Sequence, residues 1–328
     1  MSYWDQFLAI LRALFREKPP EEPEPGEGLP EALRPRVLLI IYNPTIHTEG
    51  GRRLTEVLGW NDPDALVREY MADLRECSHD FLDYQIVQRI EADVWPVKKD
   101  GFRYDEQSFL RCWRSQSGFH QPDEVDYRAI LDEFDLPARV NAGQIDEVWL
   151  FAFPYAGLYE SIMVGPGAFW CNAPPMPRRD LSRRFILMGF NYQRGVGEML
   201  EAFGHRIESI LDHTWRHFRG DDNLYQRFIL YDKKAPGRAN CGWMHYAPNS
   251  QSDYDWGNRT PVPSNCDDWL NFPHFRGTTR LVDCSEWGGG DIRLHHKWWF
   301  RHLPRAPGQT LGIANNWWWY GVDPNEVR

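Results

Sequence analysis

The sequence predicts an α/β protein, with an open, mostly parallel sheet covered by helices in a flavodoxin- or Rossmann-like arrangement, followed by an irregular cap. Two observations support this prediction. Short apolar runs of buried-strand length alternate with segments whose apolar residues have helical spacing. From Asp221 onward the chain is rich in Gly, Pro, Asn and Trp and shows few periodic segments. With 328 residues, the chain is long enough for one large domain or two modest ones.

Composition excludes several classes of protein. The chain has 37 Lys and Arg against 47 Asp and Glu, a formal charge of −10, and no long basic cluster, so we expect no nucleic-acid partner. Its apolar runs are far shorter than the roughly 20 residues that a transmembrane helix needs. No signal-peptide pattern precedes them, which predicts a cytoplasmic protein, or an extracellular one if a signal was removed. Six widely spaced cysteines without a C-x-x-C pair predict reduced, mostly buried thiols. If a signal was removed, disulfides among Cys241, Cys266 and Cys284 are the alternative.

Residues 1–17 are predicted to form an amphipathic helix, and residues 18–36 a linker rich in Pro and Glu. The apolar positions of the helix are Trp4, Phe7, Leu8, Leu11, Leu14 and Phe15. This face could pack on the rest of the chain or serve as the docking site for a partner.

Residues 37–220 are predicted to form the α/β domain. The expected elements are a strand at 37–42, a helix from 63 to about 77, a strand within 84–94, a helix at about 123–134, strands at 148–153 and 185–190, and a helix from 196 to about 218. Asp62 and Pro63 supply a capping side chain and a first-turn proline for the first of these helices. Strands that alternate with helices favour a parallel sheet.

Residues 221–328 are predicted to form a loop-rich cap subdomain. This segment holds nine of the 16 tryptophans, and we expect most of them to stabilise irregular loops by core packing. Eight of the 11 histidines lie at or after position 205, among them His245, the adjacent His295 and His296, and His302.

The predicted helix at 196–218 is the most informative segment. One side carries the apolar stripe Leu200, Phe203, Ile207, Ile210, Leu211 and Thr214, which must face the sheet. The other side carries the line Glu198, Glu201, His205, Glu208 and Asp212, at alternating spacings of three and four residues. Like charges on one helix face repel each other mildly, so this line is either a solvated surface or a site for a cation.

We interpret the acidic line as a metal site covered by the cap. His205, Glu208 and one of His295 or His296 are the predicted ligands, and zinc is the ion expected for mixed imidazole and carboxylate donors. Glu201 or Glu198 would orient or deprotonate a water bound to the metal. A solvated acidic face is one alternative, and a carboxylate site for an organic substrate is another.

The ends of the predicted strands supply further candidates, because ligands of open α/β sheets collect at the carboxyl ends of strands. Glu160 follows a strand in a loop rich in Tyr and Gly, and is a third candidate catalytic carboxylate. Tyr155, Tyr192 and Arg194 are predicted to bind substrate there, and Trp298 is predicted to do so from the cap. Glu198 and Glu208 lie about 15 Å apart along a helix, which leaves open whether the strand-end loops share a pocket with His205.

These residues favour a metal-dependent hydrolase that acts on an amide or other acyl bond of a small molecule, peptide or glycan. The alternative is a carbohydrate-active enzyme or glycan-binding protein that uses Trp platforms with Asp and Glu pairs. A second alternative is a non-enzymatic interaction protein recruited by the N-terminal helix. A dinucleotide fingerprint is incomplete because Leu200 stands where the third glycine is required, and no phosphate loop, H-E-x-x-H helix or nucleophile elbow occurs.

Overall fold

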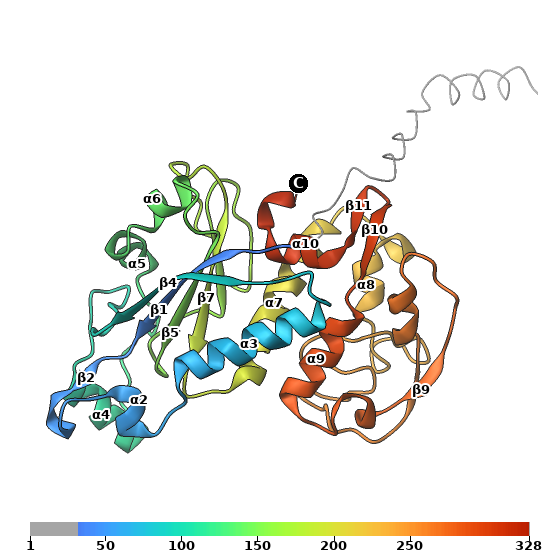
Figure 1. Ribbon diagram of the computed structural model, residues 1–328. Coiled ribbons are helices and arrows are strands. Elements are labelled where there is room, and N and C mark those ends of the chain that lie inside the picture. Colours follow the sequence, from blue (N-terminus) through green and yellow to red (C-terminus); the bar gives the residue numbers. More distant parts are fainter. Residues whose placement is uncertain (1–31, 328) are drawn as a thin grey trace, which may run out of the picture.

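The computed structural model describes residues 32–327, and at its centre lies a five-stranded sheet in the order β4-β1-β5-β7-β6 (Figure 1). The strands are β1 (Arg36–Tyr42), β4 (Gln85–Ala92), β5 (Glu147–Ala152), β6 (Ser161–Val164) and β7 (Phe185–Asn191). The first four strands in this order are parallel, and β6 runs antiparallel to β7 at one edge. The prediction of an α/β protein with a mostly parallel sheet is therefore confirmed, while the flavodoxin- or Rossmann-like assignment stays a prediction.

Burial follows the position of each strand in the sheet. Every residue of β5 is buried, and so is every residue of β1 after Arg36, because both strands have neighbours on two sides and helices over their faces. In β4 only Ala92 is fully buried, since this strand lies at the other edge. The difference explains why β1 and β5 are continuous apolar runs, whereas β4 mixes apolar and charged residues.

The sheet domain contains the helices α2 (Leu54–Leu58), α3 (Pro63–Cys77), α4 (Glu106–Ser115), α5 (Tyr127–Glu133), α6 (Leu136–Asn141) and α7 (Val196–Thr214), and the short hairpin of β2 (Thr45–Ile46) and β3 (Arg52–Arg53). Asp62 caps α3 by accepting a hydrogen bond from Asp64 N at 3.0 Å, as expected from the sequence. The helix expected at 123–134 begins instead at Tyr127, where Asp126 is the cap. Neither α4 nor β6 was predicted.

The C-terminal third has few regular elements. They are α8 (Leu224–Phe228), β8 (Val262–Ser264), β9 (Arg280–Val282), α9 (Ile292–His302), β10 (Arg305–Thr310), β11 (Ile313–Asn316) and α10 (Trp317–Val322), together with several 3-10 turns. Both α9 and α10 pack on α7, and α9 also packs on α3 (Figure 1). Seven of its nine tryptophans are buried, as expected for side chains that fill the space between irregular loops.

Helix α7 is held between the sheet and the C-terminal third by a buried ion pair. Arg206 donates to Glu147 of β5 at 2.5 Å and to the carbonyl groups of Gly321 and Val322 in α10, both at 3.0 Å. Both charged side chains are almost fully buried, so each must be neutralised by the other. This pair connects the sheet, α7 and the C-terminal helix.

The predicted N-terminal helix and most of the predicted linker lie outside the described residues. Within the described part of the linker, Leu33 bridges Leu82, and β1 begins at Arg36. All six cysteines are buried and unpaired, as the sequence predicted. No helix within residues 32–327 combines the length and the hydropathy that crossing a bilayer requires.

Candidate metal centre

A cavity of about 670 Å³ lies between the polar side of α7 and the loop that contains Trp243, His245 and Tyr254. From α7 it is lined by Glu201, His205 and Glu208, the middle of the acidic line. This side of α7 is not a solvated surface, since Glu201 is only 6% exposed. The C-terminal third therefore covers the acidic line at its centre, whereas Asp212, at its end, is exposed.

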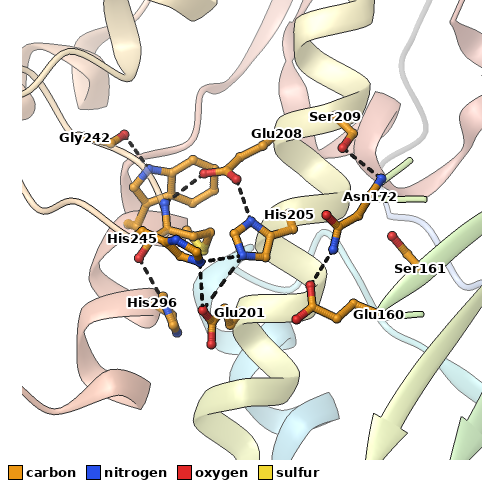
Figure 2. Close-up of polar contacts among 12 residues, drawn as sticks. Glu160, Ser161, Asn172, Glu201, His205, Glu208, Ser209, Gly242, His245 and His296 are labelled. Carbon is orange, nitrogen blue, oxygen red and sulfur yellow. Dashed lines mark hydrogen bonds and ion pairs between the residues drawn. The ribbon is translucent and has the colours of Figure 1, made fainter. Parts of the chain in front are cut away.

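Three side chains converge on one point in this cavity (Figure 2). The Nε2 atoms of His205 and His245 lie 3.0 Å apart. Glu201 Oε1 lies 3.1 Å from His245 Nε2 and 3.8 Å from His205 Nε2. These three residues form one of two groups in the described part of the chain whose donor atoms are close enough to hold a metal ion together.

Glu208 lies on the opposite side of the His205 ring. Its Oε2 atom is 2.8 Å from His205 Nδ1, and its Oε1 atom accepts a hydrogen bond from the backbone N–H of Met244 at 2.8 Å. The carboxylate oxygen accepts a hydrogen bond here, so Nδ1 carries a hydrogen. When the ring is neutral, Nε2 therefore has the free lone pair that can bind a metal ion. The arrangement differs from the predicted one, because Glu201 approaches the two Nε2 atoms while Glu208 orients the ring of His205.

Two imidazole nitrogens that face each other at 3.0 Å cannot both present a lone pair without a cation between them. In the absence of a metal, protons must fill this role. Burial lowers the pKa of His205, but hydrogen bonds with Glu201 and Glu208 outweigh this effect and raise the pKa to about 10. Burial raises the pKa of Glu201, but hydrogen bonds with His205 and His245 outweigh this effect and lower the pKa well below its usual range. The cluster thus keeps Glu201 ionised and attracts positive charge.

The predicted ligands His295 and His296 are not among the converging donors, although His296 lies near Glu201 (Figure 2). His296 is fully buried, with Nδ1 3.1 Å from the carbonyl oxygen of Gly197, and burial lowers its pKa to about 4. His295 is also fully buried, and neither of its ring nitrogens has a hydrogen-bond partner. His245 takes the place that the prediction gave to one of these two residues.

The remaining carboxylates flank the cluster. Glu198 Oε2 accepts a hydrogen bond from Gly195 N at 3.0 Å and so caps the start of α7, away from His205. Glu160 lines the cavity and is held by a short hydrogen bond from the side-chain amide of Asn172. Because β6 is antiparallel to β7, the start of β6 lies beside the carboxyl end of β7. Glu160, directly before β6, therefore lies at the end of the sheet where the parallel strands finish.

The predicted substrate-binding residues do not all meet. Arg194 lines the cavity, and together with Tyr155 it also lines an adjoining cavity of about 250 Å³ at the strand ends. Tyr192 is fully buried and donates a hydrogen bond to the carbonyl of Tyr42 at 3.0 Å. Trp298 is buried against Trp287 and lines neither cavity.

Sequence reasoning did not select two residues of the site. His245 was one of several histidines in the C-terminal third, and no local pattern distinguished it. Tyr254 OH lies 3.3 Å from His245 Nε2. Burial and the nearby carboxylates raise the pKa of Tyr254, so its hydroxyl keeps its proton and can donate.

The second group of potential ligands is Cys266, Asp267 and His302. Its carboxylate already has a cationic partner, since Arg280 Nε lies 2.5 Å from Asp267 Oδ2. A metal ion bound there would be repelled by this guanidinium group or would have to displace it. The cluster on α7 is therefore the better candidate for a metal site.

Searches against protein-family models, curated proteins and solved structures found no match to this chain. Interpretation of the site therefore depends on its own geometry.

Proposed function

We propose that this protein is a zinc-dependent hydrolase that cleaves amide or ester bonds of acyl groups. The observation that carries the proposal is the convergence of His205 Nε2, His245 Nε2 and Glu201 Oε1 within 3.0 to 3.8 Å of one another. Three donors arranged tetrahedrally at about 2.05 Å from zinc lie about 3.3 Å apart. The three side chains therefore need only small movements to bind the ion.

The type of site supports a catalytic role over a structural one. Structural zinc sites use four protein ligands, whereas catalytic sites use three and leave a position open, often with two His and one Glu. Here three donors border a cavity of about 670 Å³. The hydrogen bond between His205 Nδ1 and Glu208 at 2.8 Å is the outer contact that orients metal-binding imidazoles.

The chain supplies groups for the other steps of hydrolysis. When bound, zinc would polarise the acyl carbonyl and lower the pKa of a water molecule. Glu160, on the cavity wall, is the carboxylate that we propose to accept the proton of the attacking water. The Tyr254 hydroxyl is placed to donate a hydrogen bond to the oxygen on which negative charge develops, and Arg194 to hold a polar part of the substrate.

The test combines metal analysis with activity on simple acyl substrates. We expect one zinc per chain in protein purified without added metal, and loss of it in the His205→Ala, His245→Ala and Glu201→Gln variants. Glu208→Gln should retain zinc with affinity about 10 to 100 times weaker, because it removes an outer partner of a ligand. His217→Ala, at an exposed histidine shortly after α7, is the control and should change nothing.

Activity is measured with 4-nitrophenyl acetate and an N-acetylated aniline, and Glu160→Gln should lose activity while it keeps its zinc. Two His and one carboxylate also suit ferrous iron, so the metal that is found decides between hydrolysis and oxygen chemistry. Protein that binds no metal, or that binds iron and hydrolyses neither substrate, would refute the proposal.

A further inference from the structure

The metal cluster lies in the middle of a longer groove that follows α7. The cavity of about 250 Å³ at the start of the helix shares Glu160 and Arg194 with the central one of about 670 Å³. A third cavity, of about 450 Å³, shares Glu208, Ser209 and Trp243 with the central one. From Gly195 to Asp212 the helix rises about 26 Å, so the three neighbouring cavities together extend much further than one acyl group or one sugar ring requires.

Exposed aromatic rings mark each part of this groove. Within residues 32–327, the three exposed aromatic residues are Tyr155, Tyr254 and Trp170, with 41%, 54% and 57% of their surface accessible. Tyr155 lines the first cavity, Tyr254 the central one and Trp170 the third. Tyr155 stacks on Phe119 with one face, at a centroid distance of 3.5 Å. In a chain that buries most of its aromatic side chains, three partly exposed rings along one helix indicate a surface that binds something.

The polar groups between the rings indicate what is bound. Acidic, amide and hydroxyl side chains line the groove, namely Glu160, Asn172, Ser209, Asp212 and Gln226. Aromatic faces that cover the C–H faces of sugar rings, with carboxylates and amides to bind the hydroxyl groups, are a common means of holding a glycan.

An extended peptide fits the groove less well. Peptides that bind in extended form usually pair their backbone with a free sheet edge. No residue of the edge strands β4 and β6 lines the three cavities, and the floor is α7, whose backbone groups bond within the helix. A peptide backbone would therefore find few partners here.

We propose that the substrate is an extended glycan that carries acyl groups, and that it lies along α7 with one acyl group at the metal cluster. This inference rests on the zinc hydrolase proposed above. Water would add to the acyl carbonyl carbon, and the bond from that carbon to the sugar nitrogen or oxygen would break. The leaving sugar nitrogen or oxygen takes up one proton of the water, passed on by Glu160. The acyl group leaves as a carboxylate, and the second proton of the water goes to the released amine, which becomes an ammonium group, or to solvent when an alcohol is released.

The test measures how binding and deacylation depend on the length of the glycan. The probes are N-acetylglucosamine oligomers of one to five units and O-acetylated xylo-oligosaccharides. Trp170 lies beyond the metal cluster in the third cavity, so we expect Trp170→Ala to weaken binding of five-unit oligomers about tenfold and to leave single sugars unaffected. Leu270→Ala, at a residue 60% exposed outside the groove, is the control and should change neither oligomer binding nor hydrolysis of 4-nitrophenyl acetate.

The outcomes separate this inference from the hydrolase itself. If 4-nitrophenyl acetate is cleaved but neither set of oligosaccharides binds, or if N-acetylated peptides bind instead and depend on Trp170, the glycan inference is wrong and the hydrolase stands. If oligosaccharides bind in a Trp170-dependent manner to protein that takes up no zinc, the hydrolase is wrong and the groove is a glycan-binding site. Length-dependent deacylation that His205→Ala abolishes would support both.

Discussion

At the scale of single residues, the cluster shows how position determines what a carboxylate does. Glu201 and Glu208 both reach the ring of His205, from opposite sides. Glu201 lies beside the nitrogen that faces His245, while Glu208 accepts the hydrogen of the other nitrogen and is itself fixed by the backbone N–H of Met244 at 2.8 Å. Because the two side chains lie on one helix face, their local pattern does not distinguish these roles.

The raised pKa of His205 leads to a prediction about pH. In the metal-free protein this pKa is about 10, so the ring is protonated at neutral pH, and zinc must displace the proton. We expect release of about one proton per zinc at pH 7, and an affinity that rises about tenfold per pH unit toward pH 10 from this group alone. Calorimetric titration in buffers of different ionisation enthalpy measures the proton release directly.

The same shift has the opposite effect on the metal-free fold. A histidine whose folded pKa lies above its ordinary value of 6.5 stabilises the protein fully below pH 6.5, and this contribution is lost as the pH rises toward about 10. The melting temperature of metal-free protein should therefore fall over this range, and His205→Ala should reduce the fall. A melting temperature that does not change over this range would contradict the raised pKa of His205. In the calorimetric titration, zinc binding without proton release would contradict it as well.

At the scale of elements, the position of α7 against the cap depends on a glycine. A Cβ atom at Gly204 would lie 1.9 Å from Met244 Sδ, far inside van der Waals contact. The absence of a side chain at Gly204 therefore allows Met244, in the loop that contains His245, to pack closely against α7. Glycine in a helix is otherwise unfavourable by about 1 kcal/mol relative to alanine, so close packing is the physical reason for it here.

We predict that Gly204→Ala weakens zinc binding, although position 204 itself offers no donor atom to the ion, because the added methyl group displaces Met244 and with it the adjacent His245. The overpacking should also cost about 1 to 3 kcal/mol in the free energy of unfolding. Zinc affinity and urea denaturation measure the two effects. The double variant with Met244→Ala frees the space, so it should recover much of the affinity; failure to recover would show that Gly204 acts by another route.

At the scale of the whole molecule, the site joins the two parts of the chain. Glu201 and His205 belong to α7, and His245 belongs to the C-terminal third. Away from the site, α9 is tied to α3 by ion pairs in which Asp73, 5% exposed, binds Arg293 at 2.6 Å and Lys297 at 2.7 Å. Bound zinc would add a link on the other side of α7.

Zinc should therefore stabilise the entire fold. At a free concentration of about 100 times its Kd, a ligand that binds only the folded state contributes about 2.7 kcal/mol, which should raise the melting temperature by several degrees. Differential scanning calorimetry with zinc or with a chelator measures this shift. His245→Ala should show none, and His217→Ala should match the natural protein; an equal rise in His245→Ala would place the ion elsewhere.

Much of the sheet could be predicted because its signals are local. The continuous apolar runs of β1, β5 and β7 indicate strands buried on both faces, and the Asp62-Pro63 pair indicates where α3 begins. Short elements were missed for the same reason. β6 has only four residues, too few to show a period, and α4 has only three fully buried positions.

For the candidate site, one side follows from local spacing: Glu201, His205 and Glu208 lie three or four residues apart, and a helix places them on one face wherever it lies. Tertiary structure decided the other side, since His245 is 40 residues from His205 along the chain, and only the packing of the cap on α7 brings their nitrogens within 3.0 Å. It also decided that His295 and His296 are fully buried and do not converge with these donors. The physical reason is that helical periodicity acts between residues three or four apart, whereas contacts between distant segments depend on how the whole core packs.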